Sequence, residues 1–107
     1  MTAQSLLEKH ANSKVSALNS SQATDLLNSL DGWGLKDGQI ARSFSFKDFY
    51  ETMAFVNAVA YIANREDHHP DMEVSYNKCS LRFSTHSVGG LSENDFICAA
   101  KVDALME

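Results

Sequence analysis

The sequence has 107 residues, and its 9 Lys and Arg residues against 14 Asp and Glu residues give a net charge of −5. A chain of this length forms one domain, whose core can be stable without disulfides or a structural metal. Its two cysteines, Cys79 and Cys98, are too few for a disulfide scaffold and have no CxxC spacing. We therefore expect reduced thiols and a cytoplasmic location.

Charge and hydropathy exclude two kinds of partner. Binding a nucleic-acid backbone requires clustered Lys and Arg residues, which this acidic chain does not have. The longest apolar stretch, Ala58 to Ala63, is far shorter than the ~20 residues of a membrane-spanning helix. The N-terminus lacks the basic start and apolar core of a secretory signal. Residues 1–19 are predicted to form a polar tail, and residues 20–107 a single domain.

The first half of the domain is predicted to contain a helix and a hairpin. Apolar residues at helical spacing after Ser21 predict a short helix that Gly32 ends. Two runs of alternating apolar and polar residues then flank Asp37-Gly38, which is a strong turn signal. We therefore predict two antiparallel strands, the second of which reaches Phe46.

A long helix is predicted next. From Phe46 the apolar period changes from two to about 3.6 residues, which is typical of an amphipathic helix. This helix is expected to end between Asn64 and Asp67, because the residue before Pro70 is disfavoured in the α region. The expected buried stripe consists of Phe46, Phe49, Met53, Val56, Ala60 and Ala63.

The second half is predicted to contain another hairpin and a capped helix. Alternating residues from Glu73 to Ser84 predict two strands that turn near Asn77-Lys78. Ser92 is a strong N-cap for the last helix, with Asp95 at its third position. The order helix, two strands, helix, two strands, helix predicts an α+β fold, in which three helices pack on one face of a four-stranded antiparallel sheet.

Three histidines with acidic and hydroxyl neighbours lie at the ends of predicted elements. The residues concerned are Glu66, Asp67, His68, His69, Ser84, Thr85 and His86. The end of a helix and the end of a central strand can meet, which would gather three imidazoles in one cleft. Imidazole titrates near neutrality, so two of them facing one ligand can donate and accept a proton. The alternative is that polar residues simply collect in loops beside the sheet.

Other chemistries are less well supported by the residue pattern. Zinc binding by three histidines and an aspartate is disfavoured, because the consecutive His68 and His69 of an extended segment point to opposite sides. Both cysteines are expected in the core or an interface, not as nucleophiles. Gly89-Gly90 lacks the lysine of a phosphate loop, and Trp33 is expected in the core or the wall of a pocket.

Several short segments stand in a distinctive order and spacing. They are Gly32-Trp33, Phe44-Ser45-Phe46-Lys47-Asp48-Phe49, Asp67-His68-His69-Pro70, Tyr76-Asn77-Lys78, Ser84-Thr85-His86 and Gly90-Leu91-Ser92-Glu93 with Asp95. Together they resemble the signature of the pterin-4a-carbinolamine dehydratases. The resemblance covers about residues 21 to 105.

This resemblance implies an activity. Members of the family dehydrate a 4a-hydroxytetrahydropterin to a quinonoid dihydropterin, the recycling step after an aromatic amino acid hydroxylase has used its pterin. Neither a metal nor an organic cofactor is expected. Because a carbinolamine loses water fairly easily, acid–base catalysis worth ~10²–10⁴-fold would suffice.

The resemblance also implies residue roles. His68 and His86 would be the proton-transfer pair, and His69 would mainly bind and orient the pterin. The substrate pocket would be lined by Asp67 and by the segment Ser84-Thr85-His86-Ser87. Asp95 would cap the last helix and orient His86, with Glu66 and Trp33 as further supporting residues.

Two positions depart from the family pattern. Many relatives have Glu four residues before the first histidine of the pair, where this chain has Asn64. Met72 stands where many relatives have an aromatic residue. A proton-relay role for the missing carboxylate and the shape of one pocket wall are therefore in doubt.

The expected partners are a pterin substrate and further copies of the chain. Exposed sheet edges are usually paired or covered, and family members are dimers or tetramers, so we expect a homodimer or homotetramer. Relatives also act as dimerisation cofactors or assembly factors, so the alternative function is a protein-interaction module. The presence of His68, His69 and His86 together favours the enzyme over this module and over a pterin-binding protein with little turnover.

Overall fold

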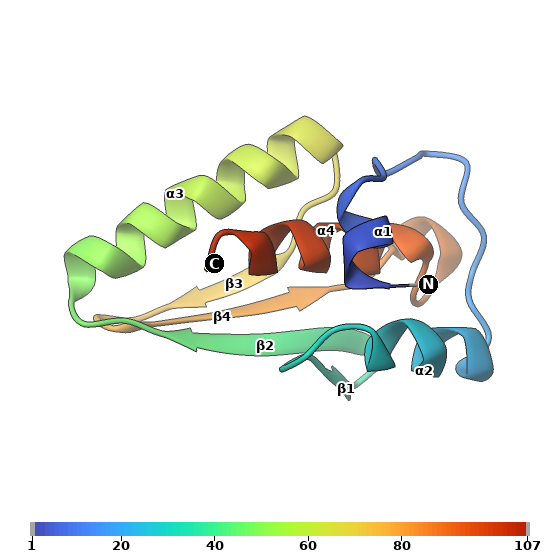
Figure 1. Cartoon of the computed structure of the whole chain (residues 1–107), viewed down its shortest axis with the longest axis horizontal. Coiled ribbons are helices and arrows are strands. Elements are labelled where there is room, and N and C mark those ends of the chain that lie inside the picture. The colour runs from blue at the N-terminus through green and yellow to red at the C-terminus, as the bar shows by residue number, and fades with distance from the viewer. Residues whose placement is uncertain (1, 107) are drawn as a thin grey trace.

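The fold is a single open sheet with helices on one side. A computed structural model of the chain describes residues 2–106. Its elements are α1 (Ala3–Leu7), α2 (Ser20–Asn28), β1 (Gly34–Lys36), β2 (Gln39–Ser45), α3 (Phe49–Glu66), β3 (Asp71–Val74), β4 (Lys78–Phe83), the short 3₁₀ helix η1 (His86–Val88) and α4 (Glu93–Ala104). The strands are all antiparallel in the order β1-β2-β4-β3, and α3 and α4 lie over one face (Figure 1). The predicted α+β fold is confirmed.

The strand register follows from the first turn. Asp37 and Gly38 both have positive φ, 52° and 76°, as a tight primed hairpin turn requires, and they bring Lys36 opposite Gln39. In the central pair of strands, Ile40 of β2 then lies opposite Phe83, the last residue of β4. The alternation of side chains turns both residues toward the helices, where both are buried.

Helix α3 differs from its prediction in the stripe that it buries. Asp48 caps the helix by accepting a hydrogen bond from Glu51 N, so Phe46 and Phe49 precede or begin the helix and do not lie within its buried face. The buried residues are Thr52, Phe55, Val59, Ala63 and Glu66, of which the sequence analysis named only Ala63. Two apolar stripes run side by side along this helix. The periodicity of apolar residues in the sequence predicted burial of the stripe that contains no polar residue.

The end of α3 is set by a backbone conformation. Asp67 adopts the left-handed region at φ 51°, and His68 N donates to Ala63 O at 3.1 Å, which closes the last turn of the helix. A left-handed residue after a helix redirects the chain. His68 thus leaves the helix axis and runs toward the sheet.

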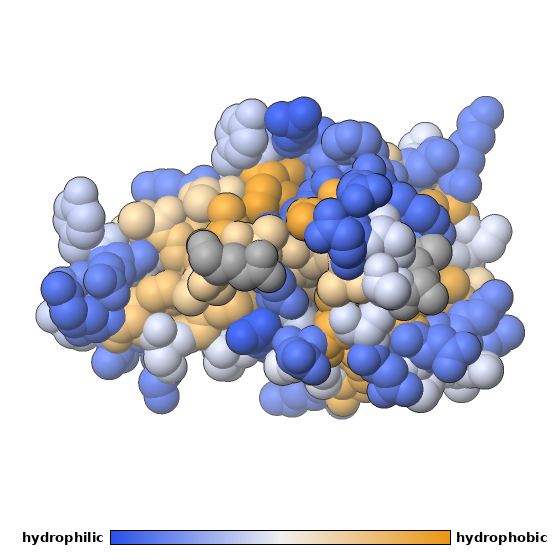
Figure 2. Space-filling view, in the orientation of Figure 1, coloured by the Kyte–Doolittle hydropathy of each residue, from blue (hydrophilic) through white to orange (hydrophobic). Residues whose placement is uncertain are grey.

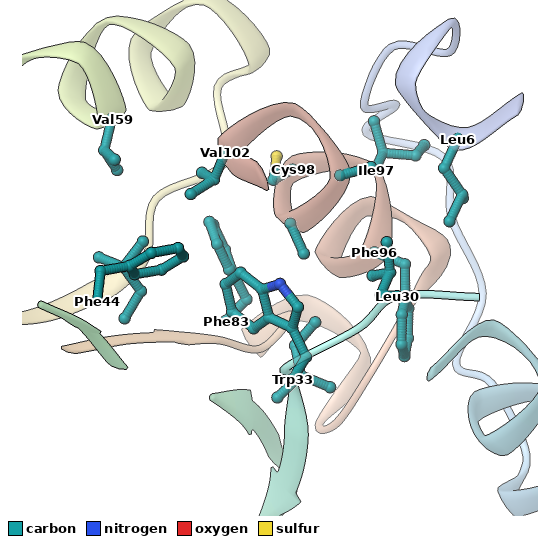
Figure 3. Close-up of a cluster of buried hydrophobic side chains, with 14 of the residues drawn as sticks. Leu6, Leu30, Trp33, Phe44, Val59, Phe83, Phe96, Ile97, Cys98 and Val102 are labelled. Carbon is teal, nitrogen blue, oxygen red and sulfur yellow. The ribbon is translucent and has the colours of Figure 1, made fainter. Parts of the chain in front are cut away.

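The N-terminal segment contains a short helix that the sequence analysis does not predict. This helix, α1, begins with a Thr2–Ser5 capping box and packs against α4. Leu6 is completely buried and points toward α4 (Figure 3), while Lys101 Nζ on α4 donates to Leu7 O at 2.9 Å. One helical turn is too short to give a periodic signal, which is why the sequence pattern did not reveal it.

The hydrophobic core lies between the sheet and α4. Figure 3 shows Trp33, Phe44 and Phe83 from the sheet side facing Cys98 and Val102 of α4. Cys79 and Cys98 are both free and buried. Burial, assisted by the charges of Glu66 and Asp95, raises the pKa of the Cys98 thiol to about 12. The expectation that the cysteines are core residues is therefore confirmed.

Replacement of Leu6 tests whether the N-terminal segment belongs to the core. We expect Leu6→Ala to lower the free energy of unfolding by about 2–5 kcal/mol, because a buried leucine leaves a cavity. Leu35→Ala is the matched control, since Leu35 is 60% exposed, and should change stability by less than about 0.5 kcal/mol. Urea unfolding followed by circular dichroism measures both. Equal stability of Leu6→Ala and the wild type would contradict a buried α1.

Candidate active site

A closed loop follows β4 and carries His86. Thr85 N donates to Gly90 O at 2.7 Å, and these two residues form an isolated bridge that joins the loop ends. Gly89 takes a positive φ of 69° at the end of η1, a conformation that glycine adopts without strain. The loop thus holds Thr85 buried beneath it and presents His86 to solvent.

The start of α4 brings a carboxylate into the interior. Ser92 Oγ accepts a hydrogen bond from Asn94 N, and Asp95 Oδ2 accepts one from Ser92 N at 2.9 Å, which is a reciprocal capping box. The side chain of Asp95 is completely buried. The predicted cap is confirmed, and it fixes an acidic group beside the end of β4.

His68 is bound to this carboxylate. Its Nε2 lies 2.6 Å from Asp95 Oδ1, while Thr85 Oγ1 donates to Asp95 Oδ2 at 2.9 Å. The sequence analysis expected Asp95 to orient His86; the structure corrects this, because the partner of Asp95 is His68. The reason is the left-handed turn at Asp67, which carries His68 from the end of α3 to the start of α4.

The donor and the acceptor can be assigned for the hydrogen bonds among Ser92, Thr85 and Asp95. The single hydroxyl proton of Thr85 is donated to Asp95, so the 2.7 Å contact between Thr85 Oγ1 and Ser92 Oγ must be donated by Ser92. Ser92 N and Thr85 Oγ1 both donate to Asp95. With its Nε2 protonated, His68 supplies a third donor to the same carboxylate. Three donors offset the cost of burying the carboxylate.

The ring of His68 is held in place by packing as well. It stacks on Phe83 with an interplanar angle of 7° and a centroid distance of 6.0 Å, and its side chain is 12% exposed. Trp33 lies behind Phe83 at a centroid distance of 5.9 Å. Among residues 2–106, Nδ1 of His68 has no hydrogen-bond partner. Nδ1 is therefore the ring nitrogen that remains to exchange a proton with a ligand.

His69 turns away from its neighbour. Its Nε2 lies 3.1 Å from Asn64 Oδ1 on α3, and the residue is exposed, as is Asp67. Asn64 is the position where many relatives carry Glu, and it still supplies a side-chain oxygen to a histidine. The two consecutive histidines thus have partners on different helices. No hydrogen bond, ion pair or ring contact among these described side chains joins His69 to the His68–Asp95 pair, and the gathering of three imidazoles around one ligand stays a prediction.

Two of the expected supporting residues lie elsewhere. The Glu66 side chain, 2% exposed, accepts hydrogen bonds from Ala11 N at 2.8 Å and pairs with His10 Nδ1 at 3.0 Å. Burial by itself raises the pKa of Glu66, but the hydrogen bonds from Ala11 and His10 and the charge of Lys101 outweigh it, so that the pKa is lowered from 4.5. Trp33 donates its indole N–H to Asp103 at 2.9 Å and supports the site only through Phe83.

A shallow groove beside the loop contains His86. Its volume is about 370 Å³, and it lies between the β1–β2 turn and the loop after β4. The lining residues are Asp37, Gly38, Gln39, Ser84, Thr85, His86, Gly89 and Gly90. Three predicted site residues, Ser84, Thr85 and His86, therefore meet there, while Ser87 is exposed on η1. Thr85 connects this groove to His68 through the carboxylate of Asp95.

Sequence reasoning missed several residues of this site. Phe83, the stacking partner of His68, was identified only as a strand residue, and Gln39, whose Nε2 lies 3.4 Å from Ser84 Oγ, was not singled out. The place of Phe83 at the end of the alternating β4 pattern was the available signal. Within residues 2–106 no three His, Cys, Asp or Glu side chains are arranged to hold a metal ion. Nor does any described helix have the length and apolarity to cross a membrane.

The sequence matches a known family. The profile of the family described as pterin 4 alpha carbinolamine dehydratase matches residues 16–105. A protein of Nitrosomonas eutropha, provisionally named pterin-4-alpha-carbinolamine dehydratase, is 59% identical over 93 residues, which are 86% of this chain and 82% of that protein. A protein of Bdellovibrio bacteriovorus with the same provisional name is 52% identical over 109 residues, covering 98% of this chain and 91% of that one.

Solved structures show the same fold. A crystal structure from Brucella melitensis, titled transcriptional coactivator/pterin dehydratase, has a TM-score of 0.82 and 36% identity, and covers 86% of this chain and 100% of that one. A pterin dehydratase-like protein identified as a RuBisCO assembly factor in the alpha-carboxysome has a TM-score of 0.57 and 24% identity, over 68% of this chain and 84% of that one; this likeness concerns the fold alone. The chain belongs to the pterin-4a-carbinolamine dehydratase family.

The lowered pKa of Glu66 predicts a loss of stability in acid. Since the folded state favours the carboxylate, Glu66 contributes stability that is present above its ordinary pKa of 4.5 and is lost as the pH falls through the lower folded-state pKa. We expect Glu66→Gln to lower the free energy of unfolding at pH 7 by about 1–3 kcal/mol and to weaken its dependence on pH below 5. Urea unfolding between pH 3 and pH 7 measures this. An unchanged acid dependence in the variant would contradict the assignment to Glu66.

Proposed function

We propose that this protein dehydrates a 4a-hydroxytetrahydropterin to a quinonoid dihydropterin and water. The observation that supports this proposal is the contact of His68 Nε2 with the buried Asp95 at 2.6 Å, which fixes the tautomer of the ring and leaves Nδ1 to meet a ligand. Membership of the dehydratase family points to the same reaction. We further propose that it serves pterin recycling in the cytoplasm, after an aromatic amino acid hydroxylase.

The reaction moves two protons, and the chain offers two imidazoles for them. With Nε2 protonated, neutral His68 presents the Nδ1 lone pair and takes the proton from the ring nitrogen next to the carbinolamine carbon. The electron pair of that N–H bond forms the carbon–nitrogen double bond, and the carbon–oxygen bond breaks. His86 delivers a proton to the departing hydroxyl, which leaves as water. His68 then gives its proton to water and His86 regains one from water, so that the overall reaction releases one water molecule and needs no oxidant.

We propose that the pterin lies between the loop of His86 and the end of α3, with one edge in the groove beside His86. The hydroxyls of Ser84 and Ser87 and the amide of Gln39 lie beside His86 or along its loop, and an amide-like heterocycle presents complementary donors and acceptors. Asp67 and His69 are exposed after α3 and would contact the substrate from the opposite side. In this arrangement His68 and His86 catalyse, and His69 binds and orients.

The Asp95→Asn variant tests whether Asp95 supports catalysis or only stabilises the start of α4. An amide at this position can donate to Nε2, which reverses the tautomer of His68, so we expect a large part of the ~10²–10⁴-fold contribution of acid–base catalysis to be lost. Stability should change by less than about 1 kcal/mol, because the amide oxygen of Asn can still accept the hydrogen bond from Ser92 N in the capping box. The control is Asp48→Asn, since Asp48 also accepts a backbone N–H at the start of a helix, from Glu51 N, but touches no histidine. It should keep full activity.

The assay measures the rate of 4a-hydroxytetrahydropterin breakdown and compares it with the uncatalysed rate. The proteins tested are the wild type, Asp95→Asn, His68→Ala and His86→Ala. Both histidine variants should be slower than the wild type by about 10-fold or more. A wild-type rate equal to the uncatalysed rate would disprove the dehydratase. Full activity of Asp95→Asn together with a stability loss above about 1 kcal/mol would reduce Asp95 to a cap.

We also propose, as a second function, that the chain associates through α3. The stripe that the sequence analysis expected to be buried remains partly open, with Phe49 50% exposed and Ala60 exposed. On the other side of the helix, Phe46, Ala58 and Leu105 line an apolar groove of about 400 Å³, and Figure 2 shows apolar side chains at the surface between α3 and the sheet. Such surfaces are typical of contacts between copies. We propose a homodimer or homotetramer.

A charge on the exposed stripe tests this association. We expect light scattering to give a multiple of the 11.8 kDa chain mass for the wild type. Ala60→Glu should weaken the assembly at least 10-fold in dissociation constant, since an unpaired buried charge is costly. Ser21→Glu on the exposed start of α2 adds the same charge elsewhere and should change nothing. A monomeric wild type would contradict the proposal.

A further inference from the structure

The segment of residues 9–12 runs between the end of α3 and the start of α4 and binds both. On the α3 side, Ala11 N donates to Glu66 Oε1 at 2.8 Å and His10 Nδ1 lies 3.0 Å from Glu66 Oε2. On the α4 side, Asn12 N donates to Asn94 Oδ1 at 2.9 Å and Asn94 Nδ2 donates to Asn12 O at 2.7 Å. Lys9 adds an ion pair with Glu93. We call residues 9–12 the N-terminal clasp.

The two anchor residues are sequence neighbours of the His68–Asp95 pair. Glu66 is the last residue of α3 and precedes His68 by two positions, and Asn94 directly precedes Asp95. Both anchors are buried polar residues, with relative residue exposures of 7% and 6%. Their side chains bind the clasp, Asn94 through the backbone of Asn12 and Glu66 through Ala11 N and the ring of His10. The same backbone segment therefore ties together the two chain ends that carry the imidazole and its carboxylate.

We propose that the N-terminal clasp positions His68 against Asp95, and that Glu66 and Asn94 are positioning residues of the site. The inference rests on the proposed function for its catalytic consequence, but its structural part does not depend on activity. Between α3 and α4 the chain passes through the whole β3–β4 hairpin. The clasp bridges the end of α3 to the start of α4 by hydrogen bonds to Glu66 and Asn94. A hydrogen bond of 2.6 Å tolerates little displacement.

A role in general stability is the competing explanation. Any buried hydrogen bond contributes to folding, so a fall in activity alone would not distinguish the two. The difference lies in the imidazole. Loss of the clasp should free the Nε2 proton of His68 while the protein stays folded, whereas loss of core packing at a distance should lower stability and leave that proton protected.

The variants are chosen in matched pairs. Asn94→Ala removes both bonds to Asn12. Glu66→Leu removes both bonds to the clasp, while Glu66→Gln keeps an oxygen that accepts from Ala11 N. Phe55→Leu is the stability control, because Phe55 packs against Phe44 and Phe46 in the core.

The primary measurement is the ring N–H resonance of His68 by ¹⁵N-edited NMR on the full chain, with its rate of exchange with water. The wild type should show a slowly exchanging Nε2 proton. In Asn94→Ala and Glu66→Leu we expect exchange at least about 10-fold faster, while Phe55→Leu and Glu66→Gln stay close to the wild type. In the dehydratase assay, kcat should fall about 10-fold in the first two variants with KM changed less than about 2-fold, because a misplaced base slows the reaction and leaves binding intact.

The outcomes separate this proposal from the proposed function. The proposed role of the clasp would be wrong if the His68 proton exchanged at the wild-type rate in both Asn94→Ala and Glu66→Leu. It would also be wrong if Phe55→Leu accelerated this exchange as much as those two variants do. If the wild type has no dehydratase activity but the exchange pattern holds, the proposed function fails and the positioning role stands. If Asn94→Ala or Glu66→Leu does not fold, the remaining variant and its comparison with Glu66→Gln still test the proposal.

Discussion

The buried carboxylate of Asp95 is the group on which the arrangement of the site depends. A carboxylate taken out of water is unfavourable unless donors surround it. Here the donors come from the cap of α4, from Thr85 after β4, and from His68 after α3. Three segments that are far apart in the sequence must therefore meet at one side chain. Helix capping, closure of the loop and orientation of the imidazole are coupled through it.

Local features of this structure were predictable because they depend on neighbours in the sequence. The turn at Asp37-Gly38 requires positive φ at two residues, and the sequence supplies the pair best suited to it. The Ser92–Asp95 capping box lies within one helical turn. The α+β order and the burial of both cysteines follow from the periodicity of apolar residues. The catalytic roles of the histidines stay a prediction, which rests on the family resemblance.

The remaining features depend on contacts between distant residues, and no local pattern encodes them. The family resemblance implied that Asp95 orients His86, but the left-handed Asp67 brings His68 to it instead. Helix α3 has apolar residues over a wide arc, and only packing against the sheet selects the stripe through Phe55 and Val59. Likewise, the position of residues 6–12 comes from the burial of Leu6 and from hydrogen bonds of Leu7, Ala11 and Asn12 to α3 and α4.

A domain of this size has few side chains to spare, so the residues that hold the framework also form the site. Ser92 caps α4 and ends the hydrogen-bond series to His68, and Phe83 ends β4 and supports the imidazole. A fold alone does not determine a function, and proteins that share one can differ in what they do. For this chain the feature that supports the proposed dehydratase is the donor set of Asp95, because acid–base catalysis requires an imidazole held in a fixed orientation and this carboxylate holds one.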